Sequence, residues 1–195
     1  MKKFFILSSV MLASIYMNAE VVGTYHNSYF KTDLTIEATL NDNDTFSYAW
    51  ISVISDKNDA SIVVEHKDLE NFISSLTLAR DKFTEWKHIA KTNKVTKMYK
   101  EMNIDFPDVT LAWKGVKMWF SFDNPLKMRF MILSSGEMVA SWSPEAIASE
   151  NQYIKNTIYF VFSNVDDFNS LISQLNPQQI LRKLSSTKQT ENLFQ

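Results

Sequence analysis

The stretch DLENFISSLTLARDKFTEWKHIAKTN, residues 68–93, is the one long segment of the chain with an unbroken helical period. Its apolar residues recur in steps of three and four, at Leu69, Phe72, Ile73, Leu76, Ala79, Phe83, Trp86 and Ala90. At 3.6 residues per turn they form one broad stripe, of the kind that a helix buries against a sheet. Asp68 is a suitable N-cap, and neither Pro nor Gly interrupts the run. We therefore expect one long amphipathic helix that covers a sheet.

Most of the remaining chain has the pattern of strands. Residues 33–40 alternate apolar and polar side chains, which is typical of a strand with one solvated face. Further strands are expected at 21–30, 45–54, 61–66, 109–113, 116–122, 126–133, 137–142 and 153–163. Two short helices follow, one capped by Asn164 and one begun by Pro177. The pattern predicts an α+β fold: a largely antiparallel sheet of about eight to nine strands in two meanders, with all three helices packed on one face.

The two halves of the chain share a faint similarity. One strand, acidic cap and helix match another at a constant offset, pairing Ile62, Val64 and Phe72 with Ile158, Phe160 and Phe168. This match leaves open the hypothesis of an internal duplication, on which the α+β prediction does not depend.

The first residues have the features of a secretory signal. Lys2 and Lys3 precede an apolar run over residues 4–17, and Ala19 supplies a small residue before Glu20. The alternative is an uncleaved anchor, but the run is shorter than the ~20 residues that a span needs. The chain has no Cys, which excludes lipid attachment of the bacterial lipoprotein type and suits a bacterial periplasm or exterior. We expect an exported protein, periplasmic or secreted, with a signal at 1–19, one α+β domain at 20–186, a disordered tail at 187–195, and no transmembrane segment after cleavage.

The composition argues against several chemistries. Without Cys there is neither a disulfide framework nor a thiolate site, and three widely spaced glycines do not make a phosphate loop or a nucleophile elbow. The histidines His26, His66 and His88 lack metal-ligand spacing. Without Lys2 and Lys3 the chain has 18 basic and 22 acidic residues, a net charge of −4 that gives no reason to bind nucleic acid. The sequence therefore predicts no catalytic residue, no metal and no cofactor.

Positive charge is concentrated on the second half of the long helix and just beyond it. Seven Lys or Arg residues against two acidic ones give residues 80–100 a net charge of +5. Arg80, Lys87, Lys91 and Lys94 lie along one helix edge and form a candidate ridge for an anionic partner. The alternative is a solvated edge whose long side chains cover apolar surface.

The turns of the second half predict strand registers. A two-residue turn at Lys114-Gly115 pairs Thr110 with Trp119, and a three-residue turn at 123–125 joins the next two strands. A three-residue turn at 134–136, with Gly136 in the left-handed position, pairs Phe130 with Ala140. These registers place Leu111, Met118, Phe120, Phe130, Ala140 and Trp142 on a core face. On the opposite face they predict a ligand-binding row of Thr110, Trp119, Arg129 and Ser141, with Arg129 stacked on Trp119. The alternative is that a second layer covers this face.

The sequence favours a non-enzymatic binding protein, because every strong catalytic motif is missing. Its expected partner is a glycan, a peptide or a protein. One alternative is a hydrolase built on scattered carboxylates, which only needs two of them across a cleft. Another is a protein inhibitor or envelope-assembly partner that acts through a sheet edge.

Overall fold

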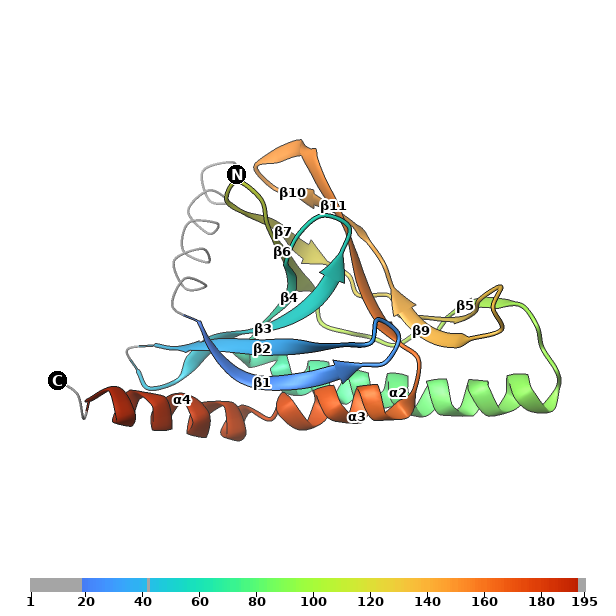
Figure 1. Cartoon of the computed structure of the whole chain (residues 1–195), viewed down its shortest axis with the longest axis horizontal. Helices are drawn as coiled ribbons and strands as arrows, with labels where there is room; N and C mark the ends of the chain where they lie inside the picture. The colour runs from blue at the N-terminus through green and yellow to red at the C-terminus, as the bar shows by residue number, and fades with distance from the viewer. Residues whose placement is uncertain (1–18, 42, 193–195) are drawn as a thin grey trace.

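The computed structural model describes residues 19–41 and 43–192 and has the predicted α+β fold (Figure 1). Within these residues, eleven antiparallel strands form one connected sheet. They are β1 (Glu20–Asn27), β2 (Thr32–Leu40), β3 (Phe46–Ser55), β4 (Ala60–Glu65), β5 (Met98–Glu101), β6 (Val109–Lys114), β7 (Met118–Asn124), β8 (Arg129–Ile132), β9 (Met138–Trp142), β10 (Glu145–Ala148) and β11 (Asn151–Phe162). The helices are α2 (Leu69–Thr92), α3 (Val165–Gln174) and α4 (Pro177–Asn192). The predicted signal lies outside the described residues, apart from Ala19.

The sheet consists of two wings. The first wing has the order β1-β2-β3-β4-β6-β7, and the second has the order β5-β8-β9-β11, with β10 also paired to β11. Among the described residues, strand pairing joins the wings at two residue pairs, Ile158 of β11 with Ser55 of β3 and Tyr159 with Ile54. Figure 1 shows the wings standing on one layer of helices, so the prediction that the helices share one side is confirmed.

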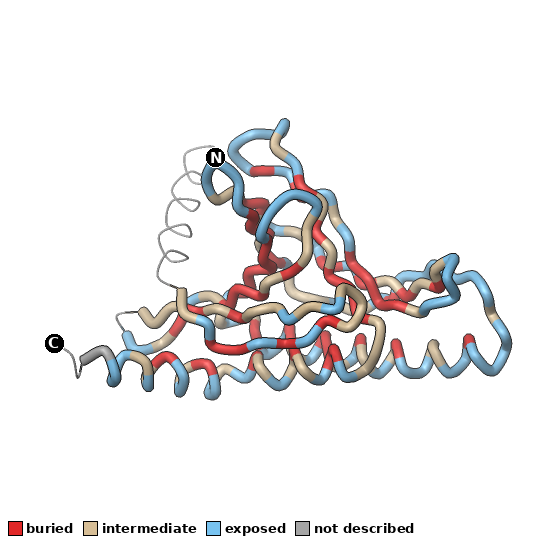
Figure 2. The backbone as a smooth tube through the Cα atoms, in the orientation of Figure 1, coloured by how far each residue is buried: buried red, intermediate tan, exposed pale blue. Residues whose placement is uncertain are grey.

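The core lies between the helix layer and the wings (Figure 2). Phe72, Leu76 and Phe83 of α2 are fully buried, as the helical period predicts. Phe83 contacts Phe130 of β8 and Phe168 of α3, with ring centroids 5.9 Å apart in both pairs. Trp86, one turn further along, is only half-buried, and its ring lies edge-on to Phe130.

Three segments differ from the sequence-based expectation. Residues 98–101, expected in a connection, form β5, and residues 145–148, expected in a loop, form β10. Both strands are four residues long, too short to give a clear alternating pattern. Helix α4 continues to Asn192, past the predicted end of the domain at residue 186. The entry of α2 is a short 3-10 turn, His66–Asp68, in which His66 stacks on Phe46.

The predicted register of the β6–β7 hairpin is wrong. Trp113, not Thr110, lies opposite Trp119, because the loop holds three residues, 115–117, instead of two. The shift by three residues is odd, so it moves Trp119 to the helix-facing side with Leu111 and moves Phe120 to the other side. Phe120 belongs there to a second, smaller buried cluster with Trp50, Val63 and Ala112.

The strands β7 and β8 do not form the predicted hairpin, because β7 ends the first wing and β8 lies inside the second. The β8–β9 prediction is confirmed: Phe130 pairs with Ala140, and Gly136 has a φ of 83°. The internal duplication stays a hypothesis. Its matched residues are all buried, and each set runs from a strand into a helix, β4 into α2 and β11 into α3.

Candidate functional site

The second wing has one face turned away from the helices. Phe130, Ala140 and Phe160 point into the core, so their neighbours along each strand point outward. The outward row includes Arg129 opposite Ser141, a pair that the turn at Gly136 predicts correctly. Val161 of β11 lies opposite Ser141 on its other side. This outer face carries the candidate site.

The outer face is hollowed into a groove of about 480 Å³, here called the outer groove. Its floor comes from β8, β9 and β11, and its walls come from the end of β3 and the turn between β1 and β2. The lining residues are Tyr29, Phe30, Ile54, Ser55, Asp56, Met131, Leu133, Val139, Ser141, Ser143, Tyr159 and Val161. Its volume lies within the ~300–1,000 Å³ range of small-molecule sites, which combine apolar and aromatic walls with a few polar groups.

Three aromatic rings gather in the outer groove. Tyr29 lies edge-on to Phe30 with centroids 4.9 Å apart, and Phe30 lies 6.3 Å from Tyr159. The Tyr159 hydroxyl donates a 2.7 Å hydrogen bond to Asp56 Oδ1. This bond holds the pKa of the Asp56 carboxyl below its usual range, and the same carboxylate raises the pKa of Tyr159. The groove is therefore lined by aromatic side chains beside a fixed carboxylate and the hydroxyls of Ser141 and Ser143, which lie 3.1 Å apart.

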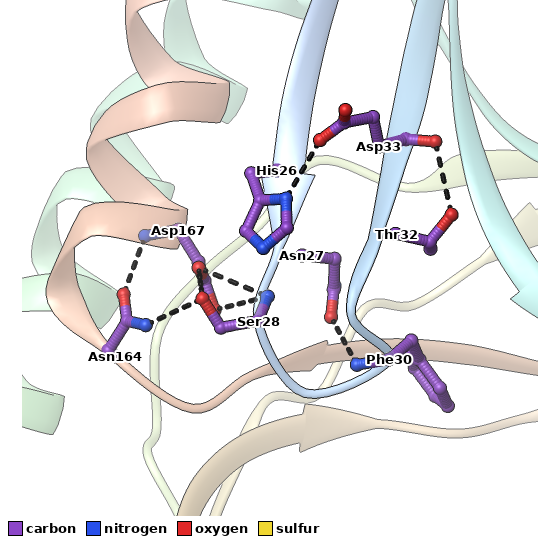
Figure 3. A network of polar contacts seen from close by, with 8 residues as sticks. All are labelled: His26, Asn27, Ser28, Phe30, Thr32, Asp33, Asn164 and Asp167. Carbon is purple, nitrogen blue, oxygen red and sulfur yellow. Dashed lines mark hydrogen bonds and ion pairs between the residues drawn. The ribbon is translucent and has the colours of Figure 1, made fainter.

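A network of polar contacts fixes the wall formed by the β1–β2 turn (Figure 3). The Asn27 side chain donates to the Val161 carbonyl at 2.8 Å and accepts from the Phe30 amide at 3.1 Å. Ser28 donates from its hydroxyl to Asp167 at 2.7 Å and accepts from Asn164 at 2.8 Å. Asn164 is the predicted cap of α3, and it accepts from the Asp167 amide. The wall is therefore attached both to β11 and to the start of α3.

Figure 3 also shows a histidine and a serine, His26 and Ser28, near each other at the end of β1. His26 bonds to Asp33 at 2.7 Å, whereas Ser28 donates to Asp167, so the structure places the serine and the histidine in two separate pairs. A nucleophilic serine would instead donate to its base. We assign this network a structural role.

A second hollow, of about 490 Å³, is more polar and touches the outer groove at Asp56. Its lining includes Asp33, Glu37, Asp56 and Asp59, which makes it a place where the scattered-carboxylate alternative could act. A general acid at neutral pH needs a raised pKa. The pKa of Asp56 is lowered instead, by its hydrogen bonds to Tyr159 and then Thr157.

The four residues predicted as a ligand-binding row are not brought together. Arg129 and Ser141 are neighbours on the second wing, but Thr110 and Trp119 belong to β6 and β7 of the first wing. The Arg129 guanidinium lies over the Tyr99 ring at 5.4 Å rather than over Trp119. Trp119 is half-buried and has the Lys117 ammonium over its ring at 4.6 Å. The aromatic partner of the predicted platform is thus a tyrosine on β5.

The predicted anionic-partner ridge is divided. Arg80 pairs with Asp81 and donates to Asn169 of α3 at 3.0 Å. Lys87 donates to the Ser163 carbonyl at 3.2 Å, and partial burial lowers its pKa, with the Lys91 charge adding to the effect. These two residues link α2 to α3 and to the end of β11. Lys91 and Lys94 are exposed.

Sequence reasoning missed Tyr29, Phe30, Asp56 and Tyr159. For Tyr159 a signal exists, because on a predicted strand it alternates with Phe160 and so shares a face with Val161. No sequence signal predicts that the β1–β2 turn folds over β11, since the contacting residues lie about 130 positions apart, as Asn27 and Val161 do.

Neither a metal site nor a membrane-spanning helix is found in the described residues, and the chain matches no known protein in the comparisons made. In the part of the chain that the structure describes, no group of three or more His, Asp or Glu residues is placed to hold a metal ion. Within the same residues, no helix combines the length and apolarity needed to cross a membrane. Comparison of the chain with protein-family models, curated proteins and solved structures gives no match.

Proposed function

We propose that the protein is an exported, non-enzymatic binding protein that holds a neutral sugar unit in the outer groove. The observation that carries this proposal is the meeting of Tyr29, Phe30 and Tyr159 with Asp56 and two serine hydroxyls in one groove. The C–H face of a sugar ring packs against the negative face of an aromatic ring, and its hydroxyls bond to fixed carboxylate and hydroxyl groups.

The chemistry of the groove supports binding rather than hydrolysis. Among its described lining residues, Asp56 is the one carboxylate, whereas glycoside hydrolysis uses a pair about 5–10 Å apart. The wall is also fixed before any ligand arrives, because Asn27 and Ser28 attach the turn to β11 and α3. A preformed site loses less conformational freedom on binding.

An array of neutral mono- and oligosaccharides, followed by calorimetry, tests the proposal on the chain from Glu20 onward. The start of that chain is itself checked by the intact mass of protein recovered from a native host. Tyr159→Ala should lower the affinity for the tightest-binding saccharide at least tenfold, which corresponds to about 1.4 kcal/mol of binding free energy. Tyr153→Ala is the matched control, because Tyr153 is 84% exposed and lies outside the groove.

Two results would contradict the proposal. One is the absence of any saccharide that binds, and the other is equal binding by the Tyr159 and Tyr153 variants. Release of a shorter sugar during incubation would favour the carboxylate hydrolase, and Asp56→Asn and Glu37→Gln would then identify the hollow responsible. A parallel peptide array tests the alternative that the partner is a peptide or a protein.

A further inference from the structure

A third hollow lies on the side of the second wing opposite to the outer groove, between the end of α2 and strand β5. It measures about 160 Å³ and is here called the helix-end hollow. Its walls are Trp86, Ile89 and Ala90 of α2, Val95 beyond the helix and Met98 of β5, and Phe130 of β8 also lines it. Nothing in the proposed saccharide function uses this hollow.

The helix-end hollow is apolar and preformed. The Trp86 ring packs edge-on against Phe130 with centroids 5.9 Å apart and a 90° interplanar angle, which fixes both rings. Ile89 is 46% exposed and Met98 36% exposed, so the apolar surface continues from the hollow to the outside. An engineered apolar cavity of roughly 150 Å³ takes up benzene, so a hollow of this scale holds a short apolar group.

Two ammonium groups lie beside this apolar surface, and two further lysines follow α2 in the chain. Lys100 also lines the hollow, and its Nζ lies 4.9 Å from the centre of the Trp86 ring. The Lys82 Nζ lies 5.5 Å from the same ring and donates to the Met102 carbonyl. The exposed Lys94 and Lys97 lie in the loop between α2 and β5. An apolar hollow with cationic groups beside its aromatic wall is complementary to a molecule with an apolar tail and an anionic head.

Strand geometry explains why both kinds of group meet here. Alternate residues of β5 point to opposite faces of the second wing. Met98 and Lys100 therefore face α2, whereas Tyr99 and Glu101 face outward beside Arg129. One four-residue strand thus supplies an apolar wall and a cation to the same hollow.

We propose that the helix-end hollow binds the tail of a single-chain anionic amphiphile, taken up as a monomer, with its carboxylate or phosphate on Lys100. The anionic head lies beside the Trp86 ring, where the Lys100 Nζ stands, and the aliphatic chain extends from there along Ile89 and Met98. The ligand class differs from that of the outer groove, and the two sites are on opposite faces of the wing.

Calorimetry with monomeric decanoate, decyl phosphate and decanol tests this proposal on the chain from Glu20 onward. The two anions should bind, and decanol, which lacks the charge, should bind at least tenfold more weakly. Lys100→Glu should lower the affinity for decanoate at least tenfold. Lys114→Glu is the matched control, because it makes the same charge change at an exposed position on the first wing. Ile89→Ser should weaken the anions and decanol alike.

Each other outcome overturns the proposal. Equal affinity for decanol and decanoate would show that the anionic head does not contribute to binding. Equal losses of decanoate affinity on Lys100→Glu and Lys114→Glu would show that Lys100 does not bind the head. Binding to phosphatidylglycerol vesicles without binding to monomers would make the surface a membrane contact instead. Tyr159→Ala should leave decanoate binding unchanged, so failure of the saccharide proposal and failure of this one are separable. Thermal unfolding of each variant checks that it remains folded.

Discussion

The carboxylate of Asp167, in the first turn of α3, accepts a 2.7 Å hydrogen bond from the hydroxyl of Ser28, which lies 139 residues earlier in the chain. Asp167 is only 2% exposed and also accepts from the backbone amides of Ser28 and Ser163. A carboxylate at this position also interacts favourably with the helix dipole. The contact joins the first strand pair to the C-terminal helices and thereby positions one wall of the outer groove.

Replacing Asp167 by Ala should destabilise the protein by roughly 1–3 kcal/mol, since the donors around it would be left unsatisfied and buried. Denaturant unfolding measures this loss. The control is Asp166→Ala, an exposed neighbour in the same turn, for which we expect no more than ~1 kcal/mol from the dipole. Equal losses for the two variants would show that the network contributes little beyond the dipole.

Phe83→Ala should cost roughly 3–5 kcal/mol, the usual range for a core aromatic. The side chain is fully buried and lies between Phe130 of β8 and Phe168 of α3. On the same helix Leu78 is 59% exposed, and Leu78→Ala should change the free energy of unfolding by less than about 0.5 kcal/mol. A loss below about 1 kcal/mol for Phe83→Ala would mean that α2 does not cover the sheet as described.

The bond between Tyr159 and Asp56 should make stability depend on pH. Because the pKa of Asp56 in the folded protein lies below its ordinary value of 3.8, folding favours the ionised carboxyl. This contribution is present above pH 3.8 and is lost as the pH falls through the folded-state pKa. The difference in melting temperature between the wild type and Asp56→Asn should therefore shrink below pH 3.8. Asp59→Asn, in the same turn, is the control, and an unchanged difference at acid pH would contradict the assignment.

Gly115→Ala should displace the Trp119 indole. A Cβ at residue 115 would lie 2.6 Å from Trp119 Nε1 and 2.9 Å from Cδ1, and a ring cannot yield as a flexible chain end can. We expect a loss of about 1–3 kcal/mol, the usual cost of overpacking, together with a shift of the Trp119 emission. Gly136→Ala is the contrasting variant: its Cβ meets nothing within 4 Å, so its cost comes from the positive φ alone. An unchanged emission on Gly115→Ala would mean that the ring does not pack on this turn.

The two glycine turns also show what the sequence could predict. Gly136 has the backbone conformation that its turn type requires, so local chemistry correctly predicts the β8–β9 register. Gly115 is required for a different reason, because a tryptophan four residues away packs against it. The rules that relate turn length and glycine position to hairpin register do not take such a side-chain contact into account. The predicted β6–β7 register was therefore wrong by three residues: it paired Trp119 with Thr110 instead of Trp113 and placed Trp119 on the wrong face.

The candidate site was less accessible to prediction than the helices and strands. The long helix, its buried stripe and most strands follow from local periodicity, as the burial of Phe72 and Leu76 shows. The outer groove depends instead on the β1–β2 turn packing against β11, an arrangement specified by a few polar contacts such as that of Asn27 with Val161. Such contacts carry no period, and only half of the predicted row, Arg129 and Ser141, lies on the face that is hollowed.

Strand β5 forms one edge of the sheet, where unpaired backbone groups could add a strand from another molecule. All four of its residues are exposed, and two of them, Lys100 and Glu101, are charged. Short length and charge are the features by which proteins discourage edge-to-edge association. The strand that lines the helix-end hollow therefore also acts as a barrier to polymerisation. Engineering that replaces its charged residues with apolar ones would expose the protein to fibre formation.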